Sequence, residues 1–315
     1  MAAEMAVAQA LATIEATLAG ASRAAPRADD GELESPGAEA RALLVALLDV
    51  KRSWPVHHAD DLLPPATIDA LARAAARRAR GAPIQYATGR AAFRHLTLAV
   101  DERVLIPRPE TELLVELALA RASGGTVVDV GTGSGCIALS LASEGRFDRV
   151  IATDVSADAL SVARENAARL GAMLASPVEF RQGSLLAPLH GERVQMIVSN
   201  PPYIAHAEAA ALPALVRDWE PAIALFSPDA GIAHISALAR EAGPLLDAGG
   251  WLLLEVDARR AEGAAETVRR AGWYDEVAVH RDLAGRDRFV AARRGSMERA
   301  VPNVHAPGGA QSGAR

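Results

Sequence analysis

The chain has 315 residues, with 33 Lys or Arg against 39 Asp or Glu and a formal net charge of -6. This acidic balance provides no general positive field for phosphate groups, so we expect no direct nucleic-acid partner. A single cysteine, Cys136, excludes a disulfide framework and a cysteine-based zinc site. Without an apolar run of about 20 residues or a basic leader, we expect a cytoplasmic protein with no membrane partner and no bound metal.

Residues 1–82 predict a small helical domain. Apolar residues recur at helical spacing over residues 3–19, and Ser35-Pro36 is typical of an N-cap followed by the first helical residue. A third helix is expected over residues 65–80, which carry arginines near their end. The domain holds no chemical motif, so its expected role is substrate recognition. Residues 1–34 are expected to be partly disordered.

Residues 83–108 predict a β-hairpin that links two domains. Apolar residues alternate with others up to Val100, and a further apolar run over residues 104–106 follows a two-residue acidic turn. The segment ends in Arg108, which stands between two prolines. A rigidly held arginine indicates the wall of a site.

Residues 109–294 predict an α/β domain, because apolar strands alternate with helices. Strand 126–130 is followed by a glycine loop and a helix, which is the arrangement of a nucleotide-binding βα unit. The next strand ends in Asp154, placed to accept hydrogen bonds from ribose hydroxyls. Two late strands suit an antiparallel sheet edge, and residues 295–315 predict a disordered tail.

The spacing of the glycine loop discriminates between ligands. The loop and the acid before it comprise Asp129, Gly131, Thr132, Gly133, Ser134 and Gly135. A dinucleotide fingerprint reads G-x-G-x-x-G, and this loop misses it by one residue. An acid two residues before the first glycine opposes a pyrophosphate but suits an ammonium group. S-adenosylmethionine has an ammonium, a sulfonium and a ribose, so the pattern favours this cofactor.

A second motif, Asn200-Pro201-Pro202-Tyr203, follows the apolar strand 196–198. Asn200 offers a side-chain carbonyl, and the prolines bring no competing N–H donor to the backbone carbonyls. Two converging acceptors suit a planar NH2 group, over which Tyr203 can lie flat. A plain turn with a packed tyrosine explains the motif equally well by itself. The glycine loop and Asp154 upstream favour a methyltransferase.

Together these motifs resemble the release factor glutamine methyltransferases of the HemK/PrmC type, from about residue 35 to residue 294. The matching stretches are residues 83–86, 106–112, 129–135, Asp154 and residues 200–203. The resemblance implies a seven-stranded, Rossmann-like class I methyltransferase domain, joined by a hairpin to an N-terminal helical domain. It implies S-adenosylmethionine-dependent methylation of the glutamine amide (N5) in the Gly-Gly-Gln motif of bacterial peptide chain release factors, which tunes translation termination.

The resemblance also implies roles for single residues. The loop from Gly131 to Gly135 would hold the methionine part of the cofactor, Asp154 the ribose, and Leu185 would lie on the adenine. Asn200 and Pro201 would hold the substrate amide with Tyr203 against its plane, so that these three form the catalytic group.

Further residues complete the expected site or depart from the family pattern. Pro202 and Arg108 are expected to line the substrate site, and Asn200 also borders the cofactor. Two departures concern Ser184, which stands where an acid is common, and residues 255–257, which lack a glycine usual after the glutamate. Residues 218–221 are either a lid or an ordinary loop with a packed tryptophan.

Three other functions are left open. The Asn-Pro-Pro-Tyr motif is shared with nucleic-acid N6-adenine methyltransferases, which would want a basic cleft. Ribosomal-protein glutamine methyltransferases are related, but carry a different sequence after the arginine that corresponds to Arg108. A non-catalytic binding module is disfavoured by the intact motifs.

Overall fold

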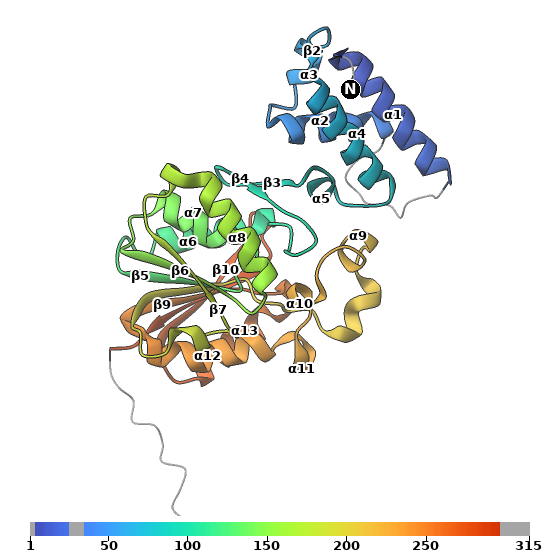
Figure 1. Ribbon diagram of the computed structural model, residues 1–315. Helices are drawn as coiled ribbons and strands as arrows, with labels where there is room; N and C mark the ends of the chain where they lie inside the picture. The colour runs from blue at the N-terminus through green and yellow to red at the C-terminus, as the bar shows by residue number, and fades with distance from the viewer. Residues whose placement is uncertain (1–3, 25–34, 297–315) are drawn as a thin grey trace, which may run out of the picture.

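The computed structural model describes residues 4–24 and 35–296. A helical body lies beside a larger α/β body, and the linking segment lies between them (Figure 1). The predictions for residues 25–34 and for the tail beyond residue 296 lie outside the described residues. Within the described ranges, no helix is long and apolar enough to cross a membrane.

The helical body is built from three helices with two short additions. Its elements are β1 (Met5–Ala6), α1 (Val7–Ala24), α2 (Pro36–Leu48), α3 (Trp54–His57), β2 (Leu62–Leu63) and α4 (Pro65–Ala79). The N-cap prediction is confirmed, because Ser35 Oγ accepts a hydrogen bond from Ala38 N at 3.2 Å. Leu43 and Leu71 are fully buried between the helices. The first helix begins later than expected, because Met5 and Ala6 pair with β2.

The linking segment differs from its prediction. It contains α5 (Ile84–Thr88), β3 (Arg90–Phe93) and β4 (Leu96–Ala99), and the hairpin is complete before Val100. The expectation that the apolar run 104–106 forms a strand is wrong. Val104 ends a turn through a hydrogen bond to Asp101 O, and its own carbonyl accepts one from Tyr86 Oη at 2.6 Å. These bonds take up backbone groups that a strand would need.

The α/β body contains the predicted seven-stranded sheet, in the order β10-β11-β9-β8-β5-β6-β7. The strands are β5 (Thr126–Val130), β6 (Arg149–Asp154), β7 (Val178–Gln182), β8 (Val194–Ser199), β9 (Leu246–Glu255), β10 (Tyr274–Arg281) and β11 (Asp287–Arg294). Five strands run parallel, while β10 and β11 form the expected antiparallel edge. The α/β class and this sheet are therefore as predicted.

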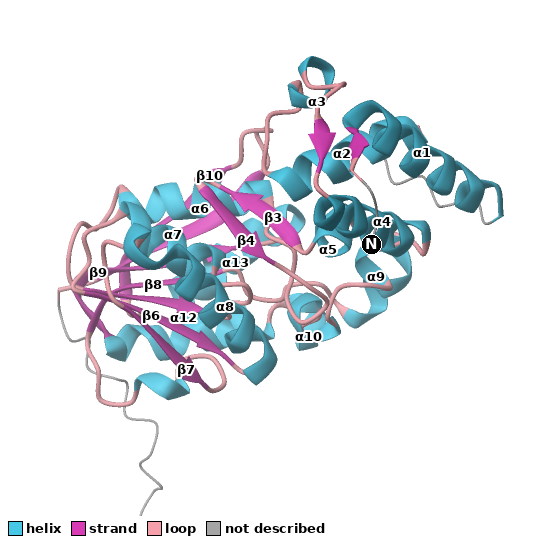
Figure 2. Cartoon of the chain, turned by 45° about the horizontal axis from the view of Figure 1, so that its top comes forward, coloured by secondary structure: helices cyan, strands magenta, loops and turns pink. Residues whose placement is uncertain are grey.

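Helices cover both faces of the sheet, as the views in Figures 1 and 2 show. The helices are α6 (Pro109–Leu119), α7 (Cys136–Glu144) and α8 (Ala157–Leu170) on one face, and α12 (Ala233–Leu245) and α13 (Ala261–Arg270) on the other. Successive residues of β5 point to opposite faces of the sheet and belong to two hydrophobic cores. Val127 lies in the core with α6 and α7, and Val128 lies in the core with α12 and α13. The sheet is buried on both sides, which explains its continuous apolar strands.

The order of the strands determines where a ligand site forms. The chain passes from β5 outward to β6 and β7, and then returns to place β8 on the other side of β5. A crevice opens at such a reversal, outside the carboxyl ends of the strands. The loops after β5, β6, β8 and β9 therefore meet at one edge of the sheet.

Candidate active site

The glycine loop after β5 has a backbone that only glycine adopts readily. Gly131, Gly133 and Gly135 have φ values of 74°, 55° and 84°. A Cβ at Gly131 or Gly133 would meet no atom within 4 Å, which means that both residues border open space. A Cβ at Gly135 would lie 2.9 Å from Leu139 Cδ1, inside the first turn of α7. Two glycines thus give access to a ligand, and the third lets the helix pack.

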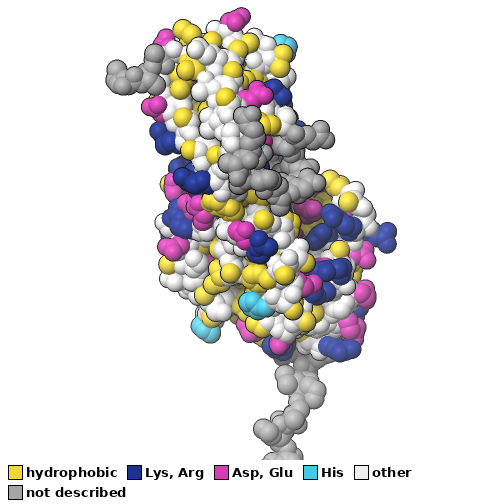
Figure 3. Space-filling model, turned by 90° about the vertical axis from the view of Figure 1, so that its right-hand side faces the viewer, with side chains coloured by type: hydrophobic (Ala, Val, Ile, Leu, Met, Phe, Trp, Pro, Cys, Tyr) yellow, Lys and Arg dark blue, Asp and Glu magenta, His cyan; other side chains and the backbone are white. Residues whose placement is uncertain are grey.

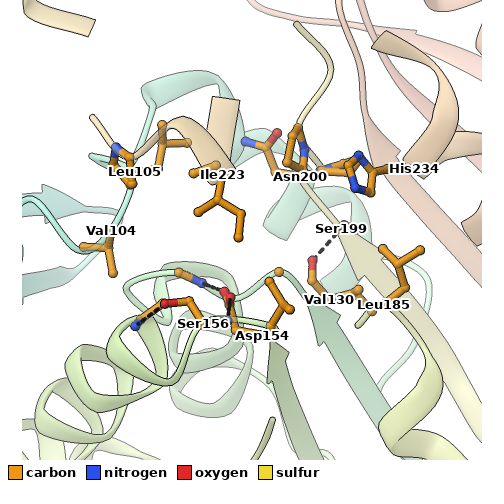
Figure 4. Close-up of a pocket in the computed structure, with 18 of the residues that line it drawn as sticks. Val104, Leu105, Val130, Asp154, Ser156, Leu185, Ser199, Asn200, Ile223 and His234 are labelled. Carbon is orange, nitrogen blue, oxygen red and sulfur yellow. Dashed lines mark hydrogen bonds between the residues drawn. The ribbon is translucent and has the colours of Figure 1, made fainter. Parts of the chain in front are cut away.

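Asp154, at the end of β6, ties the neighbouring loops together. Its Oδ2 accepts from Gly133 N and its Oδ1 from Ser156 N, both at 2.9 Å. Burial raises the pKa of Asp154, although these backbone donors lower it. Figure 4 shows the carboxylate beside Ser156 at the floor of the cavity. Each oxygen keeps a lone pair for a further donor.

Asp129 lies deeper than the sequence interpretation implies. Its Oδ2 accepts from Thr132 Oγ1 at 2.6 Å and from Ala138 N at 3.1 Å, and the side chain is fully buried. Burial raises its pKa to about 7. Asp129, Thr132, Ser134 and Gly135 do not line the cavity beside the loop. In this structure Asp129 therefore holds the shape of the loop and the start of α7.

Asn200 follows β8, and its amide is oriented by a neighbour. Asn200 Nδ2 donates to Thr111 Oγ1 at 3.1 Å, and Thr111 Oγ1 donates to Glu255 Oε2 at 2.7 Å. Asn200 Oδ1 accepts no hydrogen bond from any described residue. The motif therefore presents an unused carbonyl oxygen.

Two cavities meet at this motif. The first, the glycine-loop cavity, is bordered by Gly131, Gly133, Asp154 and Leu185, and is seen in Figure 4. The second, the Tyr203 cavity, is bordered by Tyr203, Arg108 and mainly apolar side chains. The residues that border both are Leu105, Asn200, Pro201, Pro202 and Ala224. Of the expected residues, Gly131, Gly133, Asp154 and Leu185 thus lie on one side of this shared partition, and Arg108 and Tyr203 lie on the other.

The wall of the Tyr203 cavity contains a charged pair. Arg108 Nη2 lies 2.6 Å from Glu220 Oε1, and the Glu220 side chain is only 2% exposed. Burial raises the pKa of Glu220, while Arg108 lowers it. Burial also raises the pKa of Tyr203 well above its ordinary value, so the phenol stays neutral. This environment suits an uncharged substrate group.

Segment 204–232 shapes both cavities. It contains η3 (His206–Ala211), α9 (Ala214–Arg217), α10 (Ala222–Leu225) and α11 (Pro228–Gly231). Trp219 packs against the helical body and against the linking segment, while Ile223 borders the glycine-loop cavity. The segment over which a lid was considered is thus anchored at Trp219 and Glu220.

Several residues of the site carry no signal in the sequence. Val104 and Leu105 of the linking segment border the glycine-loop cavity, as does His234 of α12, whose Nδ1 lies 2.8 Å from Ser227 Oγ. Thr111 and Glu255 hold Asn200 from two distant elements. The resemblance drew attention to residues 106–112 and 255–257, but it did not show that Thr111 and Glu255 are in contact.

The two departures from the expected pattern have different structural contexts. Ser184 borders the glycine-loop cavity beside Leu185, whose φ is 47°. Asp257 stands two residues after Glu255 and caps η4 (Ala258–Arg260), where its Oδ1 accepts from Arg259 N at 2.8 Å. In this chain the residue two positions after Glu255 therefore caps the start of a short helix.

Known proteins show the same combination of parts. Family models match residues 109–218, as Methyltransferase small domain, and residues 9–89, as PrmC N-terminal domain. A release factor glutamine methyltransferase from Moorella thermoacetica is 42% identical over 268 residues, which cover 84% of this chain and 94% of the relative. Those from Deinococcus radiodurans and Cereibacter sphaeroides are each 43% identical, covering 82% and 86% of this chain, and 92% and 95% of the relatives.

The chain belongs to the release factor glutamine methyltransferase family. Membership confirms the family resemblance that the sequence indicated. The two models fall on the helical body with its linker and on the first strands of the sheet. Within the part of the chain that the structure describes, no group of three or more His, Cys, Asp or Glu is arranged to hold a metal ion.

Proposed function

We propose that this chain transfers a methyl group from S-adenosylmethionine to the side-chain amide nitrogen of the glutamine in the Gly-Gly-Gln motif of bacterial peptide chain release factors. The observation that carries the proposal is the pair of cavities that share Asn200, Pro201 and Pro202. A methyl donor on one side and an amide on the other would meet at that partition. The family relationship supplies the identity of the substrate.

The glycine-loop cavity suits S-adenosylmethionine. Open space beside Gly131 and Gly133 admits the methionine part close to the backbone, and Asp154 has lone pairs for the ribose hydroxyls. Leu185 offers an apolar surface for the adenine. When bound, the cofactor supplies an electrophilic methyl group on a positively charged sulfur.

The residues of the motif would orient the substrate. An amide nitrogen is a weak nucleophile because it shares its lone pair with the carbonyl, so orientation and charge stabilisation give most of the rate. Asn200 Oδ1 and the Pro201 carbonyl would accept the two N–H bonds of the NH2 group, and these bonds tighten as positive charge grows on nitrogen. Tyr203 would pack against the amide plane. The C–S bond to the methyl group breaks as the N–C bond forms, and the nitrogen loses one proton, so the products are N5-methylglutamine, S-adenosylhomocysteine and H⁺.

Arg108 and the apolar residues of the Tyr203 cavity would receive the peptide next to the glutamine. The guanidinium is held by Glu220 and is still partly exposed, so it has donors left for a backbone or side-chain carbonyl. Residues 1–82 would recognise the body of the release factor, and residues 83–108 would join that domain to the catalytic domain of residues 109–294. On the face seen in Figure 3, acidic side chains lie among the basic ones, which suits a protein partner better than a phosphate backbone.

The proposal is tested by mass spectrometry of a purified release factor after incubation with the enzyme and S-adenosylmethionine. One added methyl on the Gly-Gly-Gln glutamine is expected. A factor in which that glutamine is replaced serves as the control and should stay unmodified.

Two other outcomes would contradict the proposal and support one of the alternative functions. Labelled methyl on DNA adenine, with none on the factor, would identify a nucleic-acid methyltransferase. Label on a ribosomal protein, with none on the factor, would identify the related ribosomal-protein activity.

A further inference from the structure

A buried chain of hydrogen bonds joins three elements behind Asn200. Thr111 lies in the first turn of α6 and is 2% exposed, and Glu255 is the last residue of β9 and is 1% exposed. Thr111 Oγ1 lies 3.1 Å from Asn200 Nδ2 and 2.7 Å from Glu255 Oε2. The hydroxyl therefore connects a fully buried carboxylate with the amide that borders both cavities.

The chemistry of the three groups determines the direction of each bond. A hydroxyl has one hydrogen, and an ionised carboxylate only accepts. The Thr111 hydrogen therefore goes to Glu255, which leaves Thr111 Oγ1 as an acceptor towards Asn200. Only the NH2 end of the Asn200 amide can meet that acceptor. Asn200 Oδ1 must then stand at the other end of the amide, where no described residue bonds it.

We propose that Thr111 and Glu255 are positioning residues that fix the orientation of the Asn200 amide, so that this site accepts hydrogen bonds from the substrate NH2 group. The inference rests on the proposed function, because it concerns how the same site recognises a glutamine amide. Reversing the Asn200 amide would place its own NH2 against the substrate NH2. Donor would then face donor, and the substrate nitrogen would lose an acceptor.

The ionisation of Glu255 gives this arrangement a pH dependence. Burial raises the pKa of Glu255 to about 7, although the hydrogen bond from Thr111 lowers it and the charged groups around it have smaller effects. The titratable groups that face it are Arg288 on β11, Arg108 and Glu110 at the start of α6, Tyr203 after β8 and Cys136 at the start of α7. A protonated Glu255 can donate to Thr111, whose hydrogen is then free to turn towards Asn200. The acceptor orientation is therefore lost as pH falls below about 7.

The test compares Thr111→Val, Thr111→Ser and Glu255→Gln by methylation of a purified release factor. Valine has the shape of threonine without the hydroxyl, so kcat should fall by about 10- to 100-fold, while the KM for the factor and the affinity for S-adenosylmethionine stay near wild type. Serine keeps the hydroxyl and should restore most of kcat. Thr267→Val is the matched control, because that exposed hydroxyl bonds only to Gly263 O in α13.

The pH profile provides a second and independent readout. The kcat of the wild-type enzyme should decline below about pH 7, and Glu255→Gln should have a lowered kcat without that decline. If the melting curve shows that Thr111→Val does not fold, the pH profile of kcat for Glu255→Gln decides whether the inference holds. The inference is overturned if Thr111→Val, or the folded Glu255→Gln variant, turns over like wild type with the same profile.

The same experiments distinguish a failure of this inference from a failure of the proposed function. A wild-type enzyme that leaves the release factor unmodified would contradict the proposed function. A wild-type enzyme that methylates the factor, with a Thr111→Val variant of equal kcat, would contradict the positioning role alone. A fall in kcat together with an equal fall in cofactor affinity would assign Thr111 to general stability and overturn the inference.

Discussion

The ion pair between Arg108 and Glu220 should contribute most of its stability by compensating a buried charge. The Glu220 side chain is 2% exposed, Arg108 is 31% exposed, and Glu220 Oε2 has no hydrogen-bond partner within the described residues. Arg108→Met keeps most of the side-chain length but leaves the carboxylate without its cation. Breaking a buried pair costs about 3–5 kcal/mol, and because Arg108 is partly exposed we expect a loss of about 3 kcal/mol, at the lower end of that range.

The loss should depend on pH in a defined direction. The pKa of Glu220 is already raised in the folded protein, mainly by burial, and without Arg108 it rises further. Between the unfolded and folded pKa values the native state binds a proton that the unfolded state has released, so stability falls as pH rises through that window. Arg108→Met should therefore lose less at pH 5 than at pH 8.

A double-mutant cycle measured by urea unfolding at both pH values is the assay. Glu220→Gln removes the buried charge, so adding Arg108→Met to it should cost much less than Arg108→Met costs alone. The control is each single variant at the same pH. Additive losses in the double variant, or an equal loss at pH 5 and pH 8, would refute the reasoning.

Three further predictions concern the two motifs and the buried acid before the loop. Asn200→Ala should lower turnover about 100-fold, measured by methylation of the release factor, with little change in cofactor affinity, measured by titration. An equal loss of cofactor affinity would contradict the role of Asn200 in binding the substrate amide. Gly135→Ala should destabilise the fold by about 1–3 kcal/mol, because φ at this position is 84° and the added Cβ would crowd Leu139. The control is Gly20→Ala in α1, whose Cβ would meet no atom within 4 Å and which should not destabilise the fold. Equal melting temperatures for the two variants would count against this prediction. Burial raises the pKa of Asp129 to about 7 in the folded protein, so the free energy of unfolding should decline as pH rises from about 4 to 7. Asp129→Asn should remove this part of the pH dependence, as measured by urea unfolding across that range. An unchanged pH dependence in the variant would contradict the prediction.

Features that depend on neighbours in the sequence were predictable. The glycine loop requires three residues of positive φ within five positions, and the Ser35-Pro36 cap is a property of a single turn. The proline pair after β8 ends the strand because proline has no backbone N–H to donate to the sheet, which the motif itself shows. The alternation of strands and helices predicted the α/β class, and the resemblance to the family implied the seven strands.

Features that depend on distant partners were not predictable. Thr111 and Glu255 are 144 positions apart and Arg108 and Glu220 are 112 positions apart, so no period or local motif links them. Asp129 is a different case, because its hydrogen-bond partners Thr132 and Ala138 are close to it in the sequence. Its assignment to the cofactor stays a prediction, and the structure adds that its Oδ2 is bonded within the glycine loop and the start of α7.

The extent of the hairpin was mispredicted for a local reason. Its turn at residues 94–95 contains neither glycine nor asparagine, although Arg94 has a φ of 52°. The Arg94 side chain compensates by bonding to Glu144 and to Glu112 O. Without a turn signal, the alternation of apolar residues could not show where the first strand ended.

Trp219 makes the two bodies of the molecule interdependent. It packs on the core of the helical body and on the linking segment, and the next residue, Glu220, holds Arg108 in the wall of the Tyr203 cavity. Losing the helical body would expose the indole and free the segment that carries this glutamate. We therefore expect the loss of this contact to lower the stability of both bodies. A chain shortened to the α/β body would keep the glycine loop yet lose the rigidity of its substrate side.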